Sequence, residues 1–178
     1  MIRLVRPDPA YHRSWLEMVR EFGGAHLDGA AIRPEAVASM ADPETFAAWV
    51  ATKNAEERAD TPVPDGWVHS TARWVLDGDE VVGSIHLRHE LTDFLREEGG
   101  HIGYSVRPSA RRRGIATRAL AMVLEECRAR GIDPVLLTCD DANVASARVI
   151  EANGGVLEDV RAGTRRYWVT LGDKAART

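Results

Sequence analysis

The feature that most constrains the fold is a change of hydrophobic period near residue 69. Between residues 69 and 90, two strand-like runs surround Asp77-Gly78, a dipeptide typical of tight hairpin turns. A third strand-like run lies at 101–108, and the continuous apolar run at 134–139 is typical of a buried strand. The pattern predicts a sheet in which at least the first two of these runs pair antiparallel.

Helical patterns come before and between these strands. Asp8 and Pro9 predict the start of a first helix that runs to about Phe22, and a second helical region is broken at Pro43. The remaining expected elements are a first strand at 2–7, helices at 116–130 and 140–155, and a last hairpin at 156–171. The resulting order, β-α-α-β-β-β-α-β-α-β-β, predicts an α/β fold: a three-layer α/β/α sandwich around a mixed, mostly antiparallel central sheet.

The length of 178 residues suits a single domain, which we assign to residues 1–172, followed by a frayed tail at 173–178. The hydrophobic fraction is 44% and the charged fraction is 28%, which is ordinary for a globular protein. The formal net charge is −4. Because nucleic-acid-binding domains are normally basic, this charge argues against nucleic acid as a partner.

The two cysteines, Cys127 and Cys139, belong to no Cys-x-x-Cys pair and have no histidine at ligand spacing. This arrangement predicts neither a metal site nor a disulfide framework, and it fits a reducing compartment. The N-terminal sequence lacks an apolar signal segment, and no apolar run reaches membrane-spanning length. We therefore expect a cytoplasmic protein with no membrane partner.

Three consecutive arginines stand directly before Gly114, between the strand at 101–108 and the helix at 116–130. The first N–H groups of a helix have no intrahelical acceptor, and the helix dipole adds positive charge there. A glycine at this position lets a ligand approach the backbone closely. The turn therefore predicts an anion site suited to a diphosphate, formed by Arg111, Arg112, Arg113, Gly114, Ile115, Ala116 and Thr117.

The stretch VRPSARRRGIATRAL (106–120) resembles the acyl-coenzyme-A-binding motif of the GNAT family of N-acetyltransferases. The family pattern Gln/Arg-x-x-Gly-x-Gly/Ala is matched by Arg111, Gly114 and Ala116. The later ANVASARVIEANGG (142–155) is similar to the family's Asn-x-x-Ala/Ser helix, which places Asn143 and Ser146 at cofactor positions. The resemblance covers nearly the whole chain, most closely residues 79–155, and implies the acyl-CoA N-acyltransferase fold.

The resemblance also implies where acetyl-CoA, the co-substrate, would lie. In such proteins the strand at 101–107 carries a bulge and splays from the strand at 134–139, and the pantetheine arm lies in the gap. The main chain of Tyr104, Ser105 and Val106 would hold that arm, and the arginine turn would hold the pyrophosphate. A neutral amine would then attack the thioester directly, with a bulge N–H stabilising the developing oxyanion.

The catalytic groups are less clear from the sequence. The family's tyrosine acid, seven residues after the helix asparagine, is replaced here by Ile150, so Tyr104 and Tyr167 become candidate acids. Candidate bases are His101, Glu98, Glu97 and Asp141. The loss of the tyrosine also supports an alternative, namely a catalytically silent acyl-CoA-binding or regulatory domain.

The expected acceptor is a primary amine on a small molecule or a peptide, and we expect a monomer or a homodimer. Two sets of charges near the expected acceptor site conflict. The acidic set would attract a cationic amine, and the basic set would attract an acidic acceptor. The acidic set is Asp28, Asp93, Glu97 and Glu98, and the basic set is Arg161, Arg165 and Arg166. From the sequence alone, the acceptor stays open.

Overall fold

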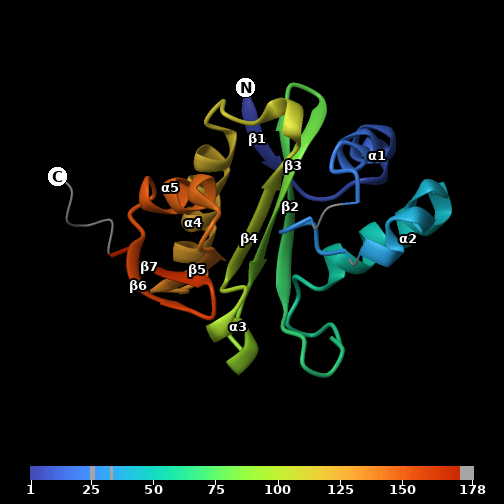
Figure 1. The fold of residues 1–178 in the computed structure, drawn as a ribbon. Helices are drawn as coiled ribbons and strands as arrows, with labels where there is room; N and C mark the ends of the chain where they lie inside the picture. Colours follow the sequence, from blue (N-terminus) through green and yellow to red (C-terminus); the bar gives the residue numbers. More distant parts are fainter. Residues whose placement is uncertain (25–26, 33, 173–178) are drawn as a thin grey trace.

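The structure is a computed structural model, and it describes residues 1–24, 27–32 and 34–172. The strands form two antiparallel sheets rather than one continuous ladder (Figure 1). The first sheet has the order β1 (Ile2–Val5), β2 (Ser70–Asp77), β3 (Glu80–Arg88) and β4 (Ile102–Val106). The second has the order β5 (Val135–Asp140), β7 (Thr164–Val169) and β6 (Val156–Arg161).

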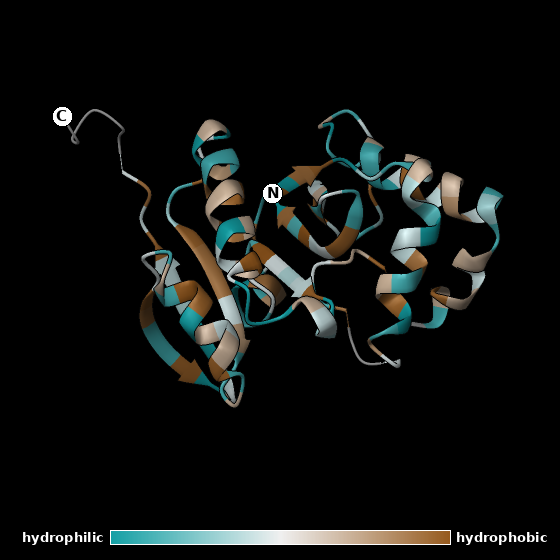
Figure 2. Ribbon diagram, turned by 90° about the horizontal axis from the view of Figure 1, so that it is seen from above, coloured by the Kyte–Doolittle hydropathy of each residue, from teal (hydrophilic) through white to brown (hydrophobic). Residues whose placement is uncertain are grey.

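Helices cover both sides of these sheets. On one side lie α1 (His12–Arg20) and α2 (Pro43–Ala55), and on the other lie α4 (Ile115–Ala129) and α5 (Val144–Glu151) (Figure 1). Figure 2 shows the two helical groups flanking strands with hydrophobic stretches. Short 3-10 turns occur at Pro9–Tyr11, Pro34–Ala36, Ala38–Ala41 and Pro108–Ala110. The predicted three-layer α/β/α arrangement is confirmed, and the tail predicted at 173–178 lies outside the described residues.

The connection between β3 and β4 contains a helix that the sequence reading did not anticipate. This short helix, α3 (Asp93–Glu97), begins where the hydroxyl of Thr92 accepts a hydrogen bond from the main-chain N–H of Leu95. A helix of five residues is too short to show a clear helical period of apolar residues in the sequence, so it was not predicted. In Figure 1, α3 lies next to the end of β4 at which that strand begins.

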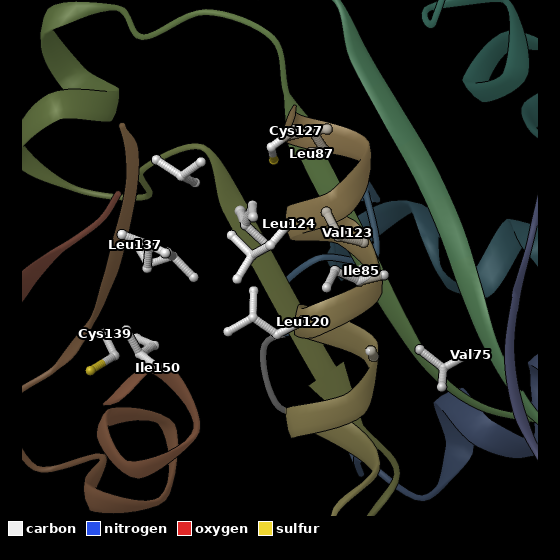
Figure 3. Packing of buried hydrophobic residues seen from close by; sticks show 14 of the residues in the cluster. Val75, Ile85, Leu87, Leu120, Val123, Leu124, Cys127, Leu137, Cys139 and Ile150 are labelled. Atoms are coloured by element: carbon white, nitrogen blue, oxygen red, sulfur yellow. The ribbon is translucent and has the colours of Figure 1, made fainter. Parts of the chain in front are cut away.

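The main hydrophobic core joins the two sheets through α4. Leu120, Val123, Leu124 and Cys127 form one buried face of this helix. Figure 3 shows that face between Leu137 of β5 and Ile85 of β3. Because one helix packs on both sheets, its burial stabilises their relative position.

A second core lies between the first sheet and helices α1 and α2. Four of its aromatic residues, Trp15, Phe46, Trp49 and Trp74, contact one another with ring centroids 5.2 to 6.5 Å apart. Aromatic packing of this kind fills a large volume with few side chains. These tryptophans are therefore core residues, not a surface for stacking bases.

The two sheets meet at only one end of β4. The main-chain N–H of His101 donates to the carbonyl oxygen of Leu136 (2.8 Å), and the N–H of Leu136 donates to Nδ1 of His101 (2.9 Å). Beside them, the N–H of Gly99 donates to Oγ1 of Thr138 (2.9 Å). Beyond this junction β4 and β5 belong to separate sheets, as the resemblance implied.

The bulge expected in the strand at 101–107 is not found. The pairing of β3 with β4 runs without a shift from Gly83 opposite Val106 to Leu87 opposite Ile102. The register shift of this sheet lies instead between Val75 and Leu76 in β2. The expectation was wrong because a bulge depends on backbone pairing, which side-chain alternation over five residues does not reveal.

We predict that Gly100→Ala destabilises the fold at the junction. Gly100 has a φ of 60°, and a Cβ there would lie 2.6 Å from the carbonyl oxygen of Leu136. Backbone strain alone costs about 1–3 kcal/mol, and the contact adds to it. In denaturant unfolding, the matched control Gly78→Ala, with a φ of 63° but open space around the new Cβ, should lose less stability. Equal losses would show that the junction is not tightly packed.

We also predict that the junction histidine makes the fold acid-sensitive. Burial lowers the pKa of His101 to about 4, so the unfolded chain binds more protons between pH 6.5 and 4 and stability falls in that window. The contribution is about 2 kcal/mol between pH 7 and pH 5. His101→Asn keeps an acceptor for the Leu136 amide but cannot titrate, so its unfolding free energy should fall by about that much less. Identical pH profiles for the two proteins would contradict this assignment.

Candidate active site

A cavity of about 820 Å³ opens between the two sheets, and we call it the central cavity. Its walls come from β4, the end of β5, the start of α5 and α3. Segments far apart in the sequence complete it, including Phe22 and Asp28 before α2 and Ala116 at the start of α4. Because the strands part beyond the junction, the cavity runs along an edge of β4.

The hydrogen-bonding alternation of β4 decides which of its main-chain groups face the cavity. At one end Arg88 donates its N–H to the carbonyl of His101 (2.7 Å), and at the other Arg107 donates to the carbonyl of Val82 (2.8 Å). In an antiparallel pair, such positions alternate with positions whose N–H and C=O point away from the partner strand. By this count, the N–H and C=O of Tyr104 point away from β3, toward the gap between the sheets.

The same alternation separates the neighbours of Tyr104. The main chain of Val106 faces the gap, and its carbonyl accepts a hydrogen bond from Nε of Arg111 (2.9 Å). The main chain of Ser105 instead pairs with Ser84 of β3, and the two hydroxyls lie 3.4 Å apart. All three predicted residues line the cavity, but Tyr104 and Val106 are the ones that offer it main-chain groups.

The arginine turn places Arg111 and Ala116 in the cavity wall. The guanidinium of Arg111 lies 5.7 Å from the centre of the Phe22 ring, a cation–π contact. Gly114 is the N-cap of α4 in the left-handed conformation (φ 74°), and no side chain caps this helix end. The first N–H groups of α4 therefore lack intrahelical acceptors. Free N–H groups beside a small residue such as Ala116 are typical of an anion site.

The other members of the predicted turn do not line the cavity. Arg113 pairs with Asp77 at 2.6 Å, and Arg112 is exposed with a φ of 60°. The Ile115 side chain is buried in the main core. Thr117 accepts a hydrogen bond at its carbonyl from the Asn153 amide (3.3 Å). Because the Ile115 side chain is buried, any contact from Ile115 to an anion would come from its main-chain N–H group.

Glu21, at the end of α1, holds the start of this turn in place. Its carboxylate accepts hydrogen bonds from Nε of Arg107 (2.7 Å) and from the N–H (3.1 Å) and hydroxyl (3.0 Å) of Ser109. The bond from Arg107 is the main reason why the pKa of Glu21 falls to about 2. The carboxylate is therefore charged at neutral pH, and its hydrogen bonds anchor the turn to α1. Nothing in the local sequence pairs Glu21 with a loop so far along the chain.

Across the cavity, α5 brings two polar side chains toward β4. Asn143 is the N-cap of α5, and its Oδ1 accepts the N–H of Ser146 (3.1 Å). The Tyr104 hydroxyl lies 2.8 Å from Oγ of Ser146 and donates to the Ser146 carbonyl (3.3 Å). Burial raises the pKa of Tyr104 to about 12, so its hydroxyl keeps its proton at neutral pH. All three side chains line the cavity.

Two of the four candidate bases, Glu98 and His101, lie in different places. Glu98 lines the central cavity and is exposed to it. His101 does not line that cavity but borders a separate hollow with Arg96 and Trp168. Its Nδ1 is already occupied by the Leu136 N–H, and its pKa is lowered to about 4 by burial. The geometry gives His101 a structural contact, and its role as a base stays a prediction.

The remaining catalytic candidates do not line the cavity. Glu97 pairs with Arg161 (3.1 Å), and Asp141 pairs with Arg165 (2.6 Å). The Tyr167 hydroxyl donates to the Glu151 carboxylate (3.0 Å). Ile150 is fully buried in the main core, which explains why an apolar residue suits that position.

The structure also brings in residues that the sequence reading did not select. Arg88, at the end of β3, lines the cavity beside Asp28 and Glu98. Thr138 and Asp140 line it from the end of β5. An arginine at the end of a predicted strand carries no motif, so only the fold could place Arg88 at the site.

Among residues 1–24, 27–32 and 34–172, no group of three or more His, Cys, Asp or Glu side chains could hold a metal ion. Within the same ranges, no helix is long and apolar enough to cross a membrane.

Solved structures with the same fold include three acetyltransferases. One is Mycobacterium smegmatis RimJ in complex with CoA-disulfide, with 18% identity, 96% of this chain and 82% of that chain covered, and a TM-score of 0.70. Another is RimL, the ribosomal L7/L12 alpha-N-protein acetyltransferase, in complex with coenzyme A (16%; 95% and 93%; 0.67). A third is the microcin C7 self-immunity acetyltransferase MccE in complex with acetyl-CoA and AMP (15%; 96% and 92%; 0.66).

A comparison with curated proteins finds no match. The profile of the acetyltransferase (GNAT) domain, however, matches residues 18–156, which is well over half of the chain. The matched stretch includes the arginine turn, β4 and α5, which all contribute residues to the walls of the central cavity. The chain therefore belongs to the GNAT family of acetyltransferases.

Proposed function

We propose that the chain transfers the acetyl group of acetyl-CoA to a primary amine of a small molecule or a peptide, by direct attack of the amine on the thioester. One observation carries the proposal: the free main-chain edge of β4 faces a cavity with an uncapped helix N-terminus at one end. That cavity has carboxylates at its other end. The structures of MccE and RimL hold acetyl-CoA and coenzyme A, which supports the same donor here.

The residues present fit such a donor. The free N–H groups at the start of α4 and the guanidinium of Arg111 would bind the pyrophosphate. The carbonyl of Tyr104 and the N–H of Val106 would hydrogen-bond the pantetheine amides, as an added strand would. Asn143 and Ser146 would contact the same arm from α5.

The cavity residues also suit the chemistry. The carboxylate of Glu98, in the cavity wall, would take the proton from the attacking amine directly or through water. The N–H of Tyr104 would stabilise negative charge on the thioester carbonyl oxygen. The Tyr104 hydroxyl, which keeps its proton, would protonate the leaving thiolate in the place of the family's tyrosine. Ile150 therefore need not mean a silent domain.

The structure favours a cationic acceptor over an acidic one. The basic residues of the last hairpin are engaged with carboxylates: Arg161 with Asp159 (2.7 Å) and Arg166 with Glu158 (2.8 Å), for example. None of that set lines the cavity. The carboxylates of Asp28, Glu98 and Asp140 do line it, so the cavity attracts positive charge.

We predict that acetyl-CoA binding depends on the start of α4. Arg111→Ala removes a charged hydrogen-bond donor and should raise the Kd for acetyl-CoA, measured by calorimetry, about tenfold or more. Ala116→Asp places a carboxylate beside the pyrophosphate site without opposing the helix dipole, and should weaken binding further. The control Arg13→Ala removes the same charge from an exposed position of α1 outside the cavity and should leave Kd unchanged. Equal affinity in all four proteins would place the anion elsewhere.

We predict that Tyr104 is the acid of the reaction. Tyr104→Phe keeps the main chain of β4 but removes the proton, and should lower kcat about 100-fold in a free-thiol assay. Tyr167→Phe, which breaks a bond to Glu151 outside the cavity, should leave kcat within about twofold of the unaltered protein. Undiminished turnover by Tyr104→Phe would assign the acid to another group or to water. Tight acetyl-CoA binding without turnover of any amine would instead support the silent domain.

A further inference from the structure

Arg88 lines the central cavity near the junction between β4 and β5, and its guanidinium is held in one orientation. Its Nη1 donates to the carbonyl oxygens of Gly99 (2.9 Å) and Gly100 (3.1 Å). Both glycines have positive φ angles, 105° and 60°, which a side chain would strain. The Gly-Gly turn therefore aims two consecutive carbonyls at one arginine nitrogen. An arginine fixed in this way has lost much of its rotamer freedom before any ligand binds.

The guanidinium of Arg88 has two further donor nitrogens besides Nη1. Among the described residues, Nε and Nη2 of Arg88 donate no hydrogen bond, and neither is one of the buried polar atoms without a partner. Nη2 lies 3.7 Å from the position that a Cβ of Gly103 would take. Gly103 directly precedes Tyr104, whose N–H faces the gap where the thioester is proposed to lie. The available donors are therefore close to the proposed site of transfer.

The charges around Arg88 are of two kinds. Asp28 and Glu98 line the same end of the cavity, and the negative charge of Asp28 opposes the effect of burial on the pKa of Arg88, which is lowered. The other guanidinium in the cavity wall belongs to Arg111, at the pyrophosphate end. This part of the cavity thus offers the carboxylates of Asp28 and Glu98 for an ammonium group. It also offers the donor nitrogens Nε and Nη2 of Arg88 for an oxygen atom.

We propose that Arg88 binds an oxygen atom carried next to the acceptor amine, so that the enzyme prefers α-amino carbonyl compounds to simple alkyl amines. The inference rests on the proposed function, because it concerns the acceptor of the same reaction. A free amino acid and the N-terminal residue of a peptide share this chemistry, as a carboxylate and an amide carbonyl respectively. In either case the amine reaches Asp28 and Glu98 while the neighbouring oxygen accepts from Arg88.

A purely structural role for Arg88 makes a different prediction. If Arg88 only secures the Gly99–Gly100 turn, replacing it lowers activity on every amine by the same factor. If it binds the acceptor, the loss depends on whether the amine carries the oxygen. The ratio of two kcat/KM values separates these cases, because any loss of folded protein cancels in it.

The test uses thiol release from acetyl-CoA with alaninamide, alanine and 2-aminopropane, which share a carbon skeleton. Arg88→Gln removes the charge and the fork, and Arg88→Lys keeps the charge alone. In Arg88→Gln the kcat/KM ratio of alaninamide or alanine to 2-aminopropane should fall about 10- to 100-fold, as for a lost hydrogen bond to a charged group. Arg88→Lys should fall between Arg88→Gln and the unaltered protein. Arg161→Gln, an arginine outside the cavity, should leave the ratio unchanged.

The outcomes divide cleanly. A larger fall for alanine indicates a carboxylate acceptor, and a larger fall for alaninamide indicates a peptide-like one; both support the proposal. A ratio unaffected by Arg88→Gln overturns it while leaving acetyl transfer intact. Thiol release from no amine, in a protein that binds acetyl-CoA by calorimetry, overturns the proposed function and this inference with it.

Discussion

The junction between β4 and β5 is the constraint on which the site depends. Two hydrogen bonds, both made by His101 to Leu136, join the strands at one end, and beyond them each strand belongs to its own sheet. Buried backbone groups are normally paired, so strands that separate leave N–H and C=O groups in need of partners. In this protein those groups are the N–H and C=O of Tyr104 and the N–H of Val106, and they face the cavity, whereas the carbonyl of Val106 accepts from Nε of Arg111. The unpaired edge is thus a consequence of where the sheets stop touching.

A split sheet needs another element to fix the width of the gap, and α4 does this. Its buried face packs against strands of both sheets, while its first turn stands at the cavity wall without a cap (Figure 3). One helix therefore sets the separation of the strands and supplies the positive end for an anion. Glu21 adds a second restraint, since it ties the preceding turn to α1 through Arg107 and Ser109. The donor end of the cavity is held by packing and by charge together.

Much of this could be predicted because it depends on local sequence. The Asp77-Gly78 hairpin, the arginine turn and the helix predicted at 140–155 all follow from turn chemistry, capping and period. The structure has each of them, although the last helix is shorter, with Asn143 as its N-cap. What the sequence could not reveal depends on pairing between distant segments. The expected bulge in β4 was wrong for that reason, and the contacts of Glu21 and Arg88 were missed. The arginines of the last hairpin looked available in the sequence, yet the fold pairs Arg161 and Arg166 with neighbouring carboxylates.

The pair Gly99-Gly100 connects the fold to the acceptor end of the site. A side chain at Gly100 would collide with Leu136, so this glycine is required for β4 to approach β5 at all. The same positive φ angles turn the carbonyls of both glycines toward Nη1 of Arg88. The glycine pair that lets β4 meet β5 at the junction therefore also fixes the guanidinium of Arg88 in the cavity wall. A bound oxygen atom would meet guanidinium N–H groups that are already oriented, so little conformational entropy would be lost on binding it. Selectivity for the acceptor would then depend on the same junction that creates the acetyl-CoA site.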